Sequence, residues 1–124
     1  MHPADDVDDL AARAPLDPLH LAAQTRGDLP LQRDLLNLFV VQSAKLMASL
    51  RVADPIAAGD LAHRLSGSAR AIGAFELAAA AEKLDGSLSP KARQAALESL
   101  AAAFDRALGA IETHLQKLSP RPGT

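Results

Sequence analysis

The chain has 124 residues and no cysteine, so it is long enough to bury one core and has neither disulfides nor thiolate metal sites. Its net charge of −2 and its 2% aromatic content argue against a nucleic-acid-binding protein, which concentrates basic and stacking side chains. No apolar run approaches the roughly 20 residues that span a bilayer, and the acidic start does not resemble a signal peptide, so we expect a cytoplasmic protein without membrane contact.

The first predicted element is a short helix over residues 15–25. Asp17 followed by Pro18 is typical of a helix N-cap with proline in the first turn, and Gly27 is expected to follow the helix end. Residues 1–14 are acidic and lack an apolar pattern, which predicts a flexible N-terminal tail.

A second helix is predicted from about Pro30 to Leu50. Its apolar side chains recur every three or four residues, which places them on one helical face. They are Leu35, Leu36, Phe39, Val40, Leu46, Met47 and Leu50.

A third helix opens at Asp54-Pro55, another cap followed by proline, and reaches Ile72. Gly73 is expected to end it with a positive φ angle. A fourth helix is predicted over residues 75–84.

The last helix begins at Ser89-Pro90 and should be the longest. Its apolar positions step by three and four residues, as in the seam of a helical bundle. They are Leu97, Ala101, Phe104, Leu108, Ile111, Leu115 and Leu118.

No segment has the two-residue alternation of a strand. The sequence therefore predicts an all-α protein: an antiparallel four-helix bundle with an additional short N-terminal helix, over residues 15–119. Residues 120–124, rich in proline, are expected to be a disordered tail, and the protein is expected to be a monomer.

The third helix carries the most informative pattern. Projected at 100° per residue, its apolar side chains gather on one side, and His63 falls on the other. The core stripe consists of Ala58, Leu61, Ala62, Leu65, Ser68, Ala69 and Ile72, and the residues around His63 are Gly59, Asp60, Ser66, Gly67 and Arg70. We therefore expect the imidazole of His63 to be exposed.

Gly59 and Gly67 stand four residues before and after His63, directly below and above it on the helix. Each interior glycine costs on the order of 1 kcal/mol relative to alanine. Their shared effect is to leave a bare surface around the imidazole, onto which a partner's backbone can dock. Arg70 leans over this surface toward His63, and Ser66 offers a hydroxyl.

The run Ala62-His63-Arg64-Leu65-Ser66-Gly67-Ser68-Ala69-Arg70-Ala71-Ile72-Gly73-Ala74, followed by Leu77 and Leu84, resembles the histidine-containing phosphotransfer (HPt) domains of two-component phosphorelays. The family pattern is roughly His-x-Leu-Lys-Gly-Ser-(small)-x-x-(aliphatic)-Gly-Ala. The matching positions are His63, Leu65, Gly67, Ser68, Ile72, Gly73 and Ala74. The predicted helices extend the resemblance over about residues 15–118.

The resemblance implies a histidine phosphocarrier without an ATP site of its own, hence not an enzyme. His63 would be the phosphoacceptor that relays a phosphoryl group between a histidine kinase or receiver aspartate and a response regulator. Neutral imidazole suits this role, because it is nucleophilic near pH 7 and needs no separate base. No cofactor is expected on this chain, since Mg²⁺ would come with the receiver's acidic pocket. Asp85 lies where the family often has a polar residue that orients the imidazole.

One position departs from the family pattern. A lysine usually stands three residues after the histidine and neutralises the phosphoryl charge, but here that position is Ser66. We hypothesise that Arg64 and Arg70 supply the missing positive charge.

The sequence offers three alternatives to a phosphocarrier. His63 with Asp60 offers too few ligands for a useful metal site, so no metal is expected. Ser66 with His63 lacks the orienting acid and the oxyanion hole of a hydrolase. A helical adaptor that binds a receiver or kinase without accepting phosphate stays open, because the lysine is missing.

Overall fold

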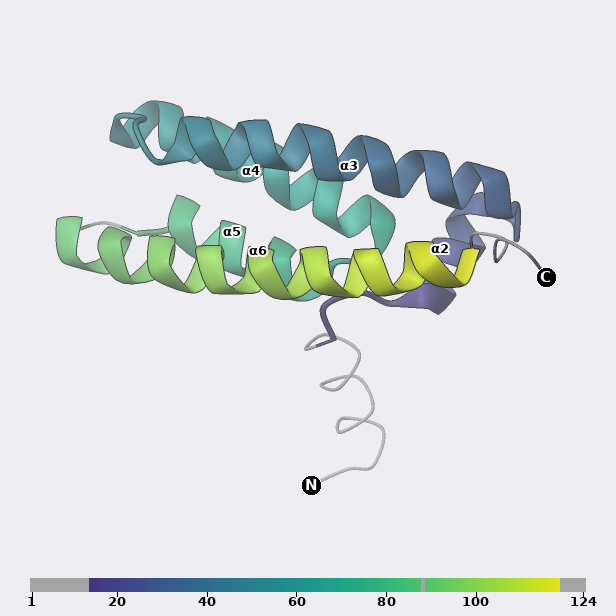
Figure 1. Cartoon of the computed structure of the whole chain (residues 1–124). Coiled ribbons are helices and arrows are strands. Elements are labelled where there is room, and N and C mark those ends of the chain that lie inside the picture. The colour runs from purple at the N-terminus through teal and green to yellow at the C-terminus, as the bar shows by residue number, and fades with distance from the viewer. Residues whose placement is uncertain (1–13, 88, 119–124) are drawn as a thin grey trace, which may run out of the picture.

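The computed structural model describes residues 14–87 and 89–118, and every regular element within them is a helix. The helices are α2 (Pro18–Thr25), α3 (Leu29–Leu50), α4 (Pro55–Ile72), α5 (Phe75–Asp85) and α6 (Pro90–Leu118). Four of them, α3 to α6, run side by side, and the short α2 lies at one end (Figure 1). The predicted all-α bundle with an extra N-terminal helix is therefore confirmed. Apart from Ala14, the two predicted tails lie outside the described residues.

Aspartate caps begin the first three helices. Asp17, Asp28 and Asp54 each accept hydrogen bonds from backbone N–H groups of the first turn, and a proline stands in that turn in all three. The carboxylate satisfies a donor that has no partner within the helix, and proline gives up an N–H that the helix does not use. These local contacts stabilise the starts of the three helices, and α2 begins at Pro18, three residues later than predicted.

Among the four long helices, α3 packs on α4 and α6, and α5 packs on α4 and α6, while the short α2 contacts α3 and α4. Small side chains line the contact between α4 and α5. Ala62 and Ala69 on α4, and Ala78 and Ala81 on α5, are all completely buried. Because alanine adds little bulk, the two backbones approach closely along this contact. Polar groups at its outer edge are thereby brought within reach of one another.

The seam predicted for α6 is only partly right. Phe104 and Ile111 are buried as expected. The other buried positions are Leu100, Ala103 and Ala107, whereas Leu97, Ala101, Leu108, Leu115 and Leu118 are partly buried at the edge of the core. The apolar face of α6 is thus wider than the predicted seam. Packing against α3 and α5 buries only the centre of this face.

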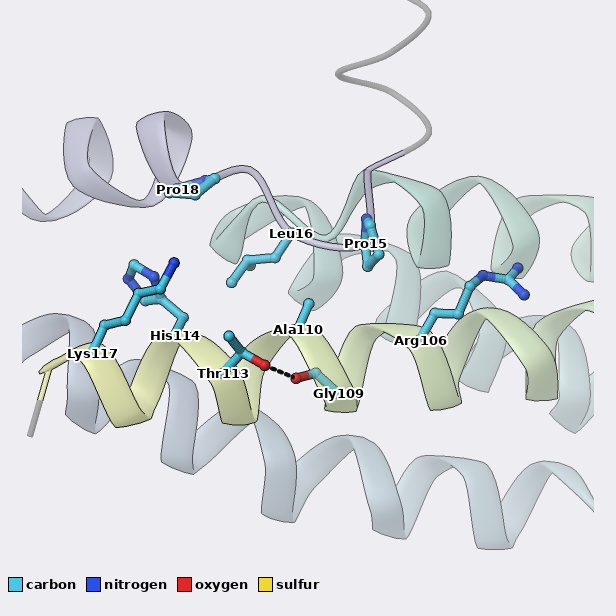
Figure 2. Close-up of a pocket in the computed structure, with 9 residues that line it drawn as sticks. All are labelled: Pro15, Leu16, Pro18, Arg106, Gly109, Ala110, Thr113, His114 and Lys117. Atoms are coloured by element: carbon cyan, nitrogen blue, oxygen red, sulfur yellow. Dashed lines mark hydrogen bonds between the residues drawn. The ribbon is translucent and has the colours of Figure 1, made fainter.

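A pocket of about 350 Å³ lies between the segment before α2 and one face of α6 (Figure 2). Pro15, Leu16 and Pro18 line one side, and α6 residues between Arg106 and Lys117 line the other. His114 is among them and lies half-buried, with its Nε2 3.4 Å from Oε1 of the buried Gln32. None of the lining residues comes from α4 or α5.

We predict that protonation of His114 destabilises the fold. Burial, and secondarily the charge of Lys117, lowers the pKa of His114 below its ordinary value. The unfolded chain then binds this proton more readily than the folded chain does. The contribution of neutral His114 to the free energy of unfolding is therefore full above about pH 6.5 and is lost as the pH falls further. Urea unfolding between pH 7.5 and 5 should show the free energy of unfolding falling less in His114→Gln than in the wild type. Equal slopes would contradict the prediction.

Candidate functional site

His63 lies in the middle of α4 and is exposed, as the helical projection predicts. Behind it, Ala62 and Leu65 are completely buried and anchor this turn of α4 in the core. The backbone that carries the imidazole is therefore rigid, while the ring itself faces solvent. This combination suits a side chain that must be reached by a second molecule.

The two glycines beside His63 differ in their surroundings. A Cβ atom added at Gly67 would meet nothing within 4 Å, so the surface one turn after His63 is open. A Cβ atom added at Gly59 would stand 3.0 Å from Oδ1 of Asp85. Gly67 thus leaves room for a molecule from outside, whereas Gly59 leaves room for a carboxylate of the protein itself.

Asp85, at the last position of α5, accordingly lies against α4 one turn before His63. The resemblance to HPt domains places a polar group near the imidazole at this position. That Asp85 orients the imidazole stays a prediction. Asp60, three residues before His63, is exposed.

The prediction that Ser66 lies on the open face is wrong. Ser66 is only 5% exposed, and its Oγ donates a hydrogen bond to Oε1 of Glu82, at 3.0 Å. The reason is the position of α5, which covers the side of α4 that holds Ala62, Ser66 and Ala69. Ser68, which the projection places in the core stripe, is instead partly exposed on the other side.

Arg70 is exposed as predicted, but its guanidinium is paired. Its Nε donates to Oε1 of Glu82 at 3.0 Å, and its Nη2 forms a second bond to the same oxygen. The side chains of Arg70 and Glu82 are 49% and 50% exposed. The arginine expected to replace the missing lysine is thus held by a carboxylate on the neighbouring helix.

Glu82 was not predicted from the sequence. Its pKa is lowered, chiefly by the hydrogen bond from Arg70 and then by that from Ser66, with a smaller contribution from the nearby charge of His63. Glu82 is therefore a carboxylate at neutral pH. The sequence could have indicated the contact between Glu82 and Ser66. If α4 and α5 pack antiparallel across the Gly73-Ala74 turn, residue 82 lies nearly opposite residue 66.

Arg64 lies on the opposite side of His63 from Arg70. It lines a groove of about 400 Å³ between α3 and α4, together with Leu61, Ser68 and Lys45. Of the two arginines proposed to supply charge, Arg64 thus lies beside α3 and Arg70 lies beside α5.

Apolar side chains are exposed at several places outside α5 and α6. Leu38 and Val41 on α3 are 52% and 54% exposed, and Val52 and Ile56 at the α3–α4 connection are 86% and 83% exposed. Leu19 on α2 is 81% exposed.

Within residues 14–87 and 89–118, no group of three or more histidine and acidic side chains is placed to hold a metal ion. No helix in the same part of the chain is long and apolar enough to cross a membrane.

Comparison with known proteins identified one family. The family model described as the Hpt domain matches residues 34–119. No curated protein and no solved structure matches the chain. The matched region contains α4 with His63 and the whole of α5 and α6.

Proposed function

Because the chain belongs to the Hpt domain family, whose members have a phosphotransfer role in two-component signalling, we propose that His63 is the phosphoacceptor of a phosphorelay. The observation that carries this proposal is the exposed imidazole at the middle of a firmly packed helix, beside the open surface at Gly67. The chain would receive the phosphoryl group from a histidine kinase or a receiver domain and deliver it to a response regulator.

The chemistry needs little from this chain beyond position. The Nε2 lone pair of neutral His63 attacks the phosphorus of an aspartyl phosphate, and the bond from phosphorus to the aspartate oxygen breaks as the Nε2–P bond forms. The electron pair of the broken bond leaves with the aspartate carboxylate. Mg²⁺ is expected in the acidic pocket of the receiver that presents this phosphate.

Asp85 is proposed to orient the imidazole. Attack through Nε2 requires the tautomer with its proton on Nδ1, and a carboxylate that accepts this N–H selects that tautomer. Asp85 is suited because its Oδ1 lies at the surface of α4 next to Gly59, one turn from His63. The same carboxylate would balance the positive charge of the ring during transfer.

The direct test is phosphoryl transfer from purified, labelled receiver domains to the purified chain. Label should appear on the chain, should be stable in base and lost in acid as a phosphohistidine is, and should map to His63 by mass spectrometry. Label that never leaves the receivers, although they do transfer to another phosphocarrier, would contradict the proposal.

A bulky side chain at Gly67 should block partners without blocking the imidazole. We predict that Gly67→Leu slows transfer from a receiver on the order of 100-fold, because the added side chain displaces the docked partner from its reacting position. The initial rate of phosphorylation by phosphoramidate, a donor too small to need docking at Gly67, should change little. Gly109→Leu is the matched control, since Gly109 is exposed in α6 and its Cβ would also meet nothing within 4 Å. Equal rates in the two variants would contradict docking at Gly67.

An adaptor that binds a receiver without accepting phosphate is the second candidate. The observation in its favour is the loss of positive charge near His63. The position of the family's lysine is occupied by Ser66, and Arg70 is paired with Glu82. Receiver binding without any acid-labile label on the chain would favour this candidate.

A further inference from the structure

Three hydrogen bonds from α4 meet on one oxygen of α5. Oε1 of Glu82 accepts from Ser66 Oγ and from Arg70 Nε, each at 3.0 Å, and from Arg70 Nη2. Ser66 and Arg70 follow His63 by three and seven residues, so all three donors lie on the side of α4 that continues into the His63 surface. Glu82 therefore holds the two polar side chains that follow His63 on this side of α4.

The path from Arg70 to His63 is open. A helical side chain leans toward the N-terminus of its helix, which directs Arg70 over Gly67. Gly67 has no side chain, and a Cβ atom there would meet nothing within 4 Å. In the ion pair between Arg70 and Glu82, each side chain is about half exposed. An exposed ion pair of this kind is weak, and its partners exchange with competing ions.

A phosphoryl group on His63 would be such a competitor. It carries up to two negative charges and three acceptor oxygens, so it attracts a guanidinium more strongly than one carboxylate does. It would also be repelled by the carboxylate of Glu82, which is held against α4 by Ser66, one turn after His63.

We propose that Glu82 is a positioning residue that holds Arg70 while His63 is free and releases Arg70 to the phosphoryl group once His63 is phosphorylated. The inference rests on the proposed function of His63. Its consequence is a less stable phosphohistidine, because phosphorylation must break an existing ion pair and leaves Glu82 beside the new charge. A phosphohistidine destabilised in this way is a better donor to the next receiver.

The test compares Glu82→Gln with the wild type, using phosphoramidate as donor so that no partner protein is involved. Glutamine keeps an acceptor for Ser66 but removes the charge. At fixed concentrations of phosphoramidate and ammonium, the equilibrium ratio of phosphorylated to free His63 should rise about threefold to tenfold in the variant. Arg70→Ala should lower this ratio.

The chain contains a matched control. Glu76, also on α5, forms an ion pair with Arg106 of α6, with 2.8 Å between Glu76 Oε1 and Arg106 Nε. Glu76→Gln breaks an Arg–Glu pair of the same kind on a different face and should leave the equilibrium unchanged. A ratio in Glu82→Gln equal to that in Glu76→Gln would overturn the inference.

A second readout follows the arginine directly. In ¹⁵N-labelled wild-type protein, the Nε–H resonance of Arg70 should move when His63 is phosphorylated, and that of Arg106 should not. A stationary Arg70 resonance at full phosphorylation would overturn the inference while leaving the phosphocarrier role intact. Failure of the wild type to accept phosphate from either phosphoramidate or receivers would instead overturn the proposed function itself.

Discussion

His63→Gln is expected to abolish phosphorylation of the chain completely, from receiver domains and from phosphoramidate alike. Glutamine has about the length of the imidazole and a similar polarity, but its amide nitrogen has no lone pair available for attack on phosphorus. Because His63 is exposed on α4, the substitution breaks no core contact, and the melting temperature should stay within about 2 °C of the wild type. Acid-labile label, measured on a gel, reports the loss.

The control for this loss is the same substitution at another imidazole. His114 is half-buried on α6 and lines the pocket of Figure 2, to which α4 and α5 contribute no lining residue. His114→Gln should therefore accept phosphate at the wild-type rate at pH 7.5. If His63→Gln retains label, or if His114→Gln loses it, the acceptor has been misidentified.

Gly73→Ala is expected to produce the largest loss of stability by a conservative substitution. Gly73 ends α4 with φ of 88°, a conformation that costs a residue with a Cβ atom roughly 1–2 kcal/mol. The added Cβ would also stand 2.8 Å from the backbone oxygen of Asp17. Asp17 donates its N–H to the carbonyl of Gly73 at 2.9 Å, so neither backbone can move without losing this bond. Together these effects should lower the free energy of unfolding by about 3 kcal/mol.

Thermal and urea unfolding measure this effect, with a fall in melting temperature of roughly 10 °C. Gly109→Ala is the opposite case, because Gly109 lies inside α6 and its Cβ would meet nothing within 4 Å. Alanine there should raise the free energy of unfolding by about 0.5–1 kcal/mol. A Gly73→Ala variant as stable as the wild type would contradict the prediction.

The candidate site was predictable to the extent that it depends on one helix. The exposure of His63 and of Arg70 follows from the 3.6-residue period of α4, as does the burial of Leu65. Ser66 was misplaced because it lies at the border of the apolar stripe. The helical period does not show which edge of the apolar stripe a neighbouring helix covers. In the structure, α5 covers the edge that contains Ser66.

The partners of the site come from α5 and depend on how two helices pack. In the sequence, Glu82 looks like an ordinary surface residue of an amphipathic helix. In the structure, its Oε1 accepts hydrogen bonds from Ser66 and Arg70. Gly59 reads as one of a symmetric pair of glycines around His63, yet the atom nearest to its missing side chain belongs to Asp85. The sequence predicted a bare surface on both sides, and the structure has it only at Gly67.

The amino-acid sequence by itself determined the order and approximate bounds of the helices, that they form a bundle, and that one imidazole faces outward from α4. These features depend on caps, prolines and apolar spacing within single segments. Only the tertiary structure decided that Arg70 is held by Glu82, that Ser66 is buried, and that Asp85 lies beside Gly59. The physical reason is that the relative register of α4 and α5 is set by the packing of buried alanines along both helices, and a one-residue change in that register would pair different side chains at its edge.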